Sequence, residues 1–166
     1  MTHPLVLGLF DTPAAAAAAA RELRALGVPR DQVSVVARNH DEEGQVAEAS
    51  PGSELEDSRV ASRLGELSAH LIAAIALVLP GIGPIVADGP LAAGLGEAAG
   101  HLAGGVAPML ERAGVPAATA EEWEQRIESG AVLVGAHLRP GAPAAEAETA
   151  LRRSGASYVT AGSWGD

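Results

Sequence analysis

Residues 5–38 have the sequence LVLGLFDTPAAAAAAARELRALGVPRDQVSVVAR, and this stretch predicts a strand, a helix and a second strand. The apolar run at 5–10 has the length of a strand, and Asp-Thr-Pro at 11–13 combines capping residues with a proline suited to a first helical turn. Residues 14–26 are rich in alanine and are followed by glycine, which predicts a helix and its end. The β-branched residues of 32–38 predict the second strand.

The same order of elements returns near the other end of the sequence. Residues 131–138 (AVLVGAHL) predict a third strand, 143–154 an alanine-rich helix, and 156–161 (ASYVTA) a fourth strand. Two such βαβ units predict an α+β, ferredoxin-like sheet of four antiparallel strands with two helices. A dinucleotide-binding fold is less favoured, because neither strand-to-helix turn carries the GxGxxG pattern.

The segment between the two halves has a different composition. Residues 39–57 hold seven of the 21 acidic residues and predict a solvated linker. A glycine-rich helical hairpin is then expected between strands two and three, with helices at 55–79 and 91–112 around the Pro/Gly segment PGIGPIVADGP at 80–90. A shorter helix at 118–129 leads into the third strand.

These elements predict one composite domain in four parts. They are a first βαβ half at 1–38, an acidic linker at 39–57, the inserted hairpin at 58–115, and a helix plus second βαβ half at 116–166. The recurrence of Gly96, Gly100 and Gly104 predicts a bare strip along one helix face against which another helix packs closely.

The charge pattern excludes several classes of function. The formal net charge is −10, and all 11 basic residues are arginines. Without lysine there is no Schiff-base or Walker-type lysine, and without a cationic surface nucleic acid is not an expected partner. The absence of cysteine excludes disulfides and thiolate chemistry. The amino-terminal apolar run is short and lacks a preceding basic residue, so we interpret the chain as cytoplasmic rather than exported.

A repeated Glu-x-x-x-His pattern is the strongest candidate for metal chemistry. Glu66 and His70 precede Glu97 and His101 with the same offset of 31 residues. Each pair would share a helical face, and an antiparallel hairpin would bring the four side chains together as a metal site or as a pH-sensitive pair. The alternative, which we favour, is a solvated polar stripe. The remaining histidines, among them His3 and His137, are interpreted as solvated residues.

An apolar pocket is the other candidate site. The hairpin is expected to pack on the sheet or across a dimer interface, or to enclose a hydrophobic ligand or peptide. The apolar positions that would line such a site are Leu71, Ile75, Val78, Ile82, Ile85 and Leu91. Trp123, Tyr158 and Trp164 are possible aromatic contacts, with ordinary packing as the alternative. The apolar helix at 71–79 is too short to cross a bilayer, although it could dip into one.

Three segments resemble a known family. They are the stretch at 5–38, the centre PGIGPIVADGPLAAGLGEAAG at 80–100, and VPAATAEEWEQRIESGAVLVGAHL at 115–138. Together they resemble the bacterial general stress protein family, small heat- or low-temperature-induced α/β proteins with a glycine-rich hydrophobic centre. The resemblance implies a role in the stress response, with no catalytic activity or cofactor assigned.

The sequence therefore predicts a non-enzymatic stress-response protein that binds or shields an apolar small molecule or peptide and uses no cofactor. A membrane-surface protein and a metal-binding protein are the alternatives. A homodimer is a reasonable expectation, because a four-stranded sheet leaves edges and the glycine strip offers a packing surface.

Overall fold

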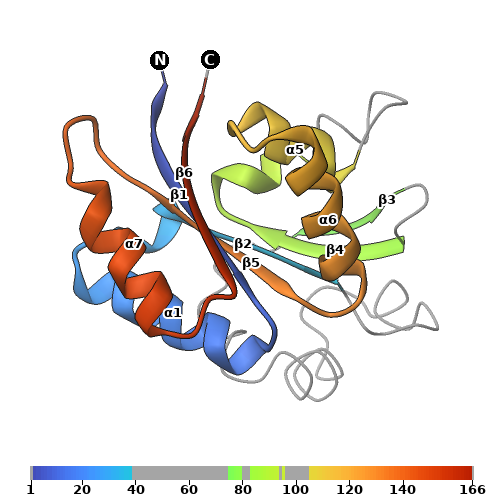
Figure 1. Cartoon of the computed structure of the whole chain (residues 1–166), viewed down its shortest axis with the longest axis horizontal. Helices are drawn as coiled ribbons and strands as arrows, with labels where there is room; N and C mark the ends of the chain where they lie inside the picture. The colour runs from blue at the N-terminus through green and yellow to red at the C-terminus, as the bar shows by residue number, and fades with distance from the viewer. Residues whose placement is uncertain (1, 39–74, 80–82, 94, 96–104, 166) are drawn as a thin grey trace.

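The computed structural model describes residues 2–38, 75–79, 83–93, 95 and 105–165. It is a mixed α+β structure built on one six-stranded antiparallel sheet with helices on both faces (Figure 1). The strand order is β3-β4-β2-β5-β1-β6. The strands are β1 (His3–Phe10), β2 (Val33–Arg38), β3 (Ile75–Leu79), β4 (Gly83–Asp88), β5 (Val132–His137) and β6 (Tyr158–Trp164).

Four of the six strands belong to two strand-helix-strand segments, at the positions that the sequence repeat predicts. Helix α1 (Pro13–Ala25) and the short 3-10 helix η1 (Arg30–Gln32) connect β1 to β2, and α7 (Ala144–Arg153) connects β5 to β6. The two units interlock, because β5 pairs with both β1 and β2. The first strand of each unit is therefore central in the sheet.

Helices cover the sheet on both sides. In Figure 1, α1 and α7 lie together against one face, and α5 (Val106–Arg112) and α6 (Ala117–Glu128) lie against the other. Strand β1 contributes to both cores: Leu5, Leu7 and Leu9 join the cluster under α5 and α6, while Val6 and Phe10 join the cluster under α1 and α7. An apolar run without polar alternation is what a strand buried on both faces requires.

The start and end of α1 follow its sequence signals. The Thr12 side chain accepts a hydrogen bond from the Ala15 amide at 3.2 Å, and Pro13 is the first helical residue. Beyond the helix, Gly27 has a φ of 94°, a left-handed conformation that favours glycine. Capping and termination are thus supplied locally, before any tertiary contact.

The predicted helical hairpin is wrong wherever the structure describes its centre. Residues 75–79, expected at the end of a helix, form strand β3, and residues 83–88, expected in a Pro/Gly loop, form strand β4. A short apolar run fits a buried strand as well as a buried helix, so periodicity alone does not separate them. Pairing with a neighbouring strand decides between strand and helix here. Strand β4 continues the sheet beyond β2, with Arg38 opposite Ile85 and Val35 opposite Asp88.

The structure describes only part of the remaining residues of the predicted linker and hairpin. Residues 90–93 and 95 are helical, and α5 occupies the end of the helix predicted at 91–112. The acidic linker at 39–57, the helix start at 55–74 and the glycine strip at Gly96, Gly100 and Gly104 lie outside the described residues. The helix predicted at 118–129 is confirmed as α6.

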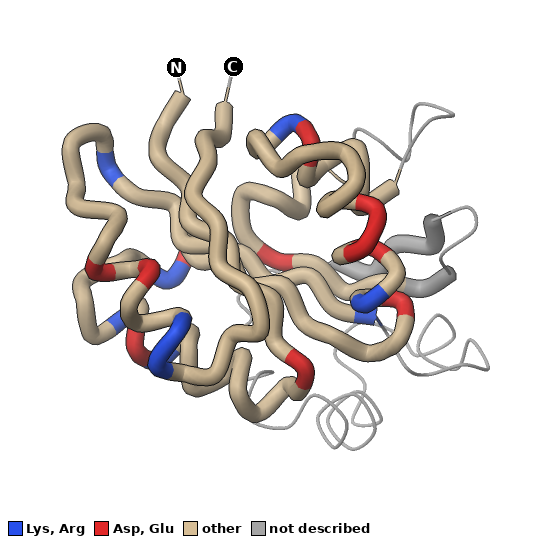
Figure 2. Tube along the Cα trace, viewed as in Figure 1, with Lys and Arg blue, Asp and Glu red and all other residues tan. Residues whose placement is uncertain are grey.

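Charges lie mainly on the helices and at strand ends, and the inner sheet is apolar (Figure 2). Among the residues that the structure describes, no helix is long and apolar enough to cross a membrane.

Candidate functional site

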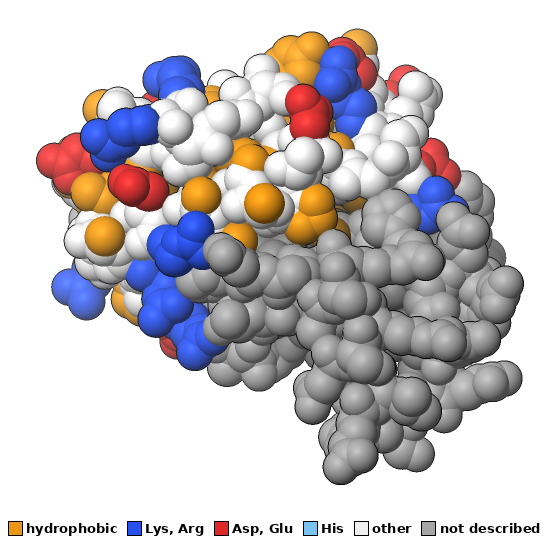
Figure 3. Space-filling view, turned by 90° about the horizontal axis from the view of Figure 1, so that it is seen from below, with side chains coloured by type: hydrophobic (Ala, Val, Ile, Leu, Met, Phe, Trp, Pro, Cys, Tyr) orange, Lys and Arg blue, Asp and Glu red, His pale blue; other side chains and the backbone are white. Residues whose placement is uncertain are grey.

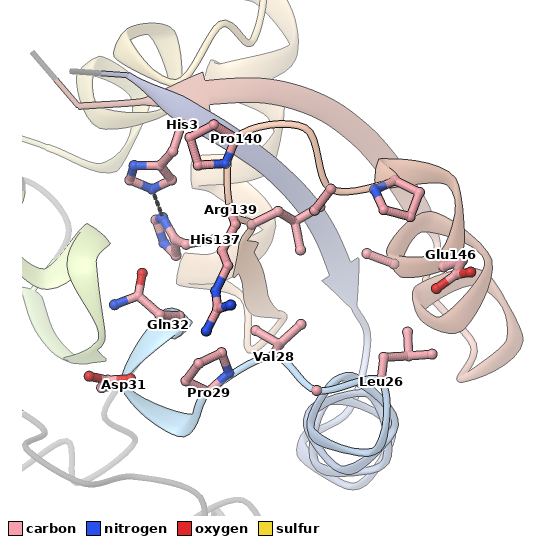
Figure 4. Close-up of a pocket in the computed structure, with 15 residues that line it drawn as sticks. His3, Leu26, Val28, Pro29, Asp31, Gln32, His137, Arg139, Pro140 and Glu146 are labelled. Carbon is pink, nitrogen blue, oxygen red and sulfur yellow. Dashed lines mark hydrogen bonds between the residues drawn. The ribbon is translucent and has the colours of Figure 1, made fainter.

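A cavity of about 640 Å³ opens at one end of the sheet, and we call it the β5-end cavity (Figure 4). Its wall comes from the start of β1, the turn between α1 and η1, the end of β5, the loop that follows β5, and the start of α7. The volume is within the range of small-molecule sites. Both βαβ units contribute, so the cavity forms only when the two halves of the sheet come together.

Two histidines of the cavity lining, His3 and His137, form a row of hydrogen-bonded side chains with Ser34, which lies behind them, and we call this row the histidine chain. Ser34 Oγ lies 2.7 Å from His137 Nε2, and His137 Nδ1 lies 2.8 Å from His3 Nε2. Ser34 Oγ also accepts a hydrogen bond from the Leu91 amide at 3.0 Å. The chain therefore links β1, β2 and β5 to the helical residues after β4.

The hydrogen bonds of Ser34 determine which atom donates at each step of the histidine chain. Because Ser34 Oγ accepts from Leu91, its own proton is free to be donated to His137 Nε2. His137 then carries its proton on Nδ1 and donates it to His3 Nε2. The reverse direction would leave the proton of a fully buried hydroxyl without an acceptor among the described residues, at a cost of about 1–3 kcal/mol.

His137 is held in its neutral form. Burial lowers the pKa of His137 to about 3, and the nearby His3 ring acts in the same direction. Only 2% of the residue is exposed, so the charged imidazolium would lose almost all of its hydration. Both nitrogens of this neutral ring are already hydrogen bonded, which makes His137 a fixed wall of the cavity rather than a free acid or base.

The turn above Ser34 depends on a glycine. Gly89 has a φ of 82°, and a Cβ there would lie 2.6 Å from the Val33 carbonyl oxygen and 2.7 Å from Ser34 Oγ. Its amide donates to the Asp88 carboxylate at 2.8 Å. Only glycine lets the chain pass this close to Ser34, which brings the Leu91 amide within reach of the hydroxyl.

The remainder of the cavity wall is mixed in character. Val28 and Leu138 contribute apolar surface, whereas Arg139, Asp31 and Glu146 contribute charge. In Figure 4 the Arg139 side chain runs from the end of β5 toward Val28 and Pro29, with Asp31 and Glu146 on opposite sides of it. A cavity that pairs apolar surface with a few polar groups is typical of a binding site for a small organic molecule.

Those predicted ligand-binding residues whose side chains the structure describes do not line this cavity. Ile85, Leu91 and Trp123 are buried in the core cluster under α5 and α6. Ile75 and Val78 belong to strand β3, and Leu71 and Ile82 lie outside the described residues.

The other two aromatic candidates lie on the edge strand β6. Tyr158 is 6.3 Å from the Trp123 ring and 5.0 Å from the Arg126 guanidinium, and Trp164 is 5.3 Å from that of Arg112. Trp164 also packs against the core cluster. These contacts account for both rings through packing and cation–π attraction within the chain.

The predicted metal ligands Glu66, His70, Glu97 and His101 fall outside the described residues. Within the part of the chain that is described, no three metal-binding side chains come together.

The sequence does not reveal the histidine chain, because its pattern favours solvated positions for His3 and His137. For His137 that interpretation is wrong, since the residue is buried. A weak signal exists: His137 and Ser34 each belong to a strand that is otherwise almost wholly apolar, AVLVGAHL and QVSVVAR. Polar residues inside buried strands need hydrogen-bond partners, and two of them can satisfy each other.

No protein-family model, curated protein or solved structure matches this chain. The similarity to the general stress protein family therefore remains a prediction from the three segments that carry it.

Proposed function

We propose that this protein is a non-enzymatic binding protein that takes a small, partly apolar molecule into the β5-end cavity. The observation that carries the proposal is the cavity itself, about 640 Å³ in volume and lined by both apolar and charged side chains. The proposed ligand is of the apolar class that the sequence predicts. Its site is at the end of the sheet instead of in the central segment.

The proposal includes a ferredoxin-like arrangement of the four central strands. Their spatial order β2-β5-β1-β6 and their antiparallel pairing support it, because a split βαβ pair produces this interleaving. Strands β3 and β4 then extend the sheet beyond β2. In such an arrangement the cavity lies where the turns of both units meet.

Among the described residues, the inaccessibility of the best candidate nucleophile, Ser34, supports a binding role. Ser34, His137 and His3 have the hydrogen-bond order of an activated serine. Ser34 is fully buried, however, and the Leu91 amide already occupies its oxygen. A substrate carbonyl would have to displace the helical residues after β4 to reach Ser34 Oγ. The histidine chain therefore fits a structural role better than a catalytic one.

The surface offers a weaker alternative. Seen from below, the described part of the surface shows hydrophobic side chains as separate spots among backbone atoms and charges (Figure 3). Scattered apolar side chains are ordinary on a protein surface. The cavity is therefore the better candidate for binding an apolar group.

The proposal can be tested with hexanol, which is apolar and uncharged and fits a cavity of this size. We expect its addition to ¹⁵N-labelled protein to shift amide signals of residues around the cavity, such as Val28, Leu138 and Ala147. Ala142→Trp, which places a large ring on the cavity wall, should abolish the shifts. Ala145→Trp, on the exposed side of α7, is the matched control and should retain them.

Shifts confined to β3, β4 and α6 would instead favour the pocket predicted from the sequence. If hexanol shifted no signals at all, the binding proposal would be rejected.

The stress-response role, the homodimer and a cytoplasmic location remain predictions from the sequence and its resemblance. The membrane-surface and metal-binding alternatives depend largely on residues that the structure does not describe. Native mass spectrometry of the purified protein, compared with the denatured chain, would report subunit number, bound metal and retained ligand together.

A further inference from the structure

We infer that the molecule taken into the β5-end cavity is a monocarboxylate, with its acid group on Arg139 and its apolar part against Val28 and Leu138. The inference rests on the proposed binding function and goes further by naming the chemical class of ligand. It is argued from the pairing of charges, from the neutrality of His137 and from the rigidity of the wall.

Arg139 differs from the arginines on the neighbouring helices. Arg152 and Arg153 of α7 lie 3.2 Å from the carboxylates of Glu148 and Glu22, and Arg126 of α6 lies 3.4 Å from Glu122. Arg139 has no ion pair with any described residue, although the chain carries 21 acidic residues against 11 arginines. An arginine left unpaired at a cavity wall is available to a ligand's carboxylate, which it can bind through two parallel hydrogen bonds.

Arg139 is the one arginine among the described residues that line the cavity, and the chain has no lysine. His137 is neutral because it is buried, and both of its ring nitrogens are engaged in the histidine chain. The permanent positive charge of the described lining is therefore confined to Arg139. An acid group entering the cavity has one place where its charge is complemented.

The backbone that carries Arg139 is fixed on both sides. Leu138 donates its amide to the Pro4 carbonyl at 2.9 Å, and the Arg139 carbonyl accepts from the Ala142 amide at 2.9 Å. Gly141 takes a φ of 84° in this turn. A pinned turn limits the backbone entropy lost on binding, so that the ordering cost falls mainly on the side chain.

The two acidic side chains of the lining restrict the ligand further. Asp31 comes from η1 and Glu146 from α7, and they lie on opposite sides of Arg139 in Figure 4. A second carboxylate on the ligand would meet one of these like charges. The apolar surface of Val28 and Leu138 suits a hydrocarbon part instead. A monocarboxylate satisfies both constraints, and a dicarboxylate does not.

The test compares three probes with six-carbon chains on the full chain at pH 7: hexanoate, hexanol and adipate. Amide shifts are titrated by NMR to obtain dissociation constants. We expect hexanoate to bind about three- to tenfold more tightly than hexanol, and adipate to bind more weakly than hexanoate. The preference for hexanoate over hexanol should shrink in 0.5 M NaCl, because the Arg139 side chain is exposed to solvent.

Variants identify the group responsible. Arg139→Met should bring the affinity for hexanoate down to that for hexanol and leave hexanol binding unchanged. Arg139→Lys keeps the charge without the planar fork and should retain part of the preference. Arg152→Met removes one positive charge from the exposed face of α7, away from the cavity wall, and should retain the full preference.

Equal affinity for hexanoate and hexanol, unchanged by Arg139→Met, would overturn the inference and leave the binding proposal standing. A preference for adipate would also overturn it. If none of the three probes bound, both proposals would fail together.

Discussion

Ser34 shows how one hydroxyl can hold three elements in place. It accepts from the Leu91 amide at 3.0 Å and lies 2.7 Å from His137 Nε2, and it has no exposed surface. Ser34→Ala would leave both partners buried without a hydrogen bond. We expect the free energy of unfolding to fall by about 1–3 kcal/mol, measured by urea denaturation.

Ser129→Ala is the matched control for this substitution. Its hydroxyl donates to the Gln125 carbonyl at 3.0 Å on the exposed side of α6, so the expected loss is within about 0.5 kcal/mol. Equal losses for the two variants would show that the histidine chain contributes no special stability.

His137 predicts a pH dependence with a definite sign. Its pKa is lowered from 6.5 to about 3, so between these values the unfolded chain binds the proton more readily than the folded protein does. The contribution of His137 to the free energy of unfolding is fully present above about pH 6.5. As the pH is lowered, the free energy of unfolding falls by up to about 1.4 kcal/mol per pH unit until the pH nears the folded pKa. Denaturation at pH 7, 6, 5 and 4 measures this slope.

His137→Gln separates this effect from the titration of carboxylates. Glutamine keeps an amide donor and acceptor but binds no proton in this range. The stability advantage of the natural protein over the variant should shrink as the pH falls from 7 to 4. An advantage that stays constant across this range would mean that His137 is not held neutral by folding.

At the scale of elements, β4 is the part of the fold where tertiary pairing overrides local sequence. Ala87 lies opposite Val36 of β2 on one side and Ile75 of β3 on the other. A proline here must remove a ladder hydrogen bond whichever neighbour its amide faces. We expect Ala87→Pro to lower the free energy of unfolding by about 3 kcal/mol or more in chemical denaturation.

Ala117→Pro provides the comparison for a proline that the fold tolerates. Ala117 is exposed, is the first residue of α6, and follows Pro116 with a ψ of 144°. Proline is favoured at this helix position and by this preceding conformation, so the expected change is below about 1 kcal/mol. A similarly small effect at Ala87 would support the loop that the sequence predicted.

At the scale of the whole molecule, two cores share one sheet. Trp123 and Trp164 both report on the cluster under α5 and α6, and the chain has no other tryptophan. The opposite cluster, under α1 and α7, contains side chains from the same central strands β1, β2 and β5. We expect tryptophan fluorescence and far-ultraviolet circular dichroism to give coincident urea unfolding curves. Separated midpoints would show that the two faces unfold independently.

The sequence by itself determined the two βαβ units, because their signals are local. Strand-length apolar runs, Thr12 and Pro13 at a helix start, and Gly27 at its end act within a few residues. Helix α6 was predictable for the same reason, within a residue of its ends. The burial of strand β1 on both faces also follows from its uninterrupted apolar pattern.

Tertiary structure alone decided the secondary structure of the central segment and brought the residues of the candidate site together. Residues 83–88 form a strand that pairs with the edge of β2, and residues 75–79 form a strand that pairs with residues 83–88. The local sequence of these residues does not indicate that such a partner is present. The histidine chain joins residues 103 and 134 positions apart. Side chains so distant in sequence meet only through strand register, since β5 pairs with β1 on one side and β2 on the other.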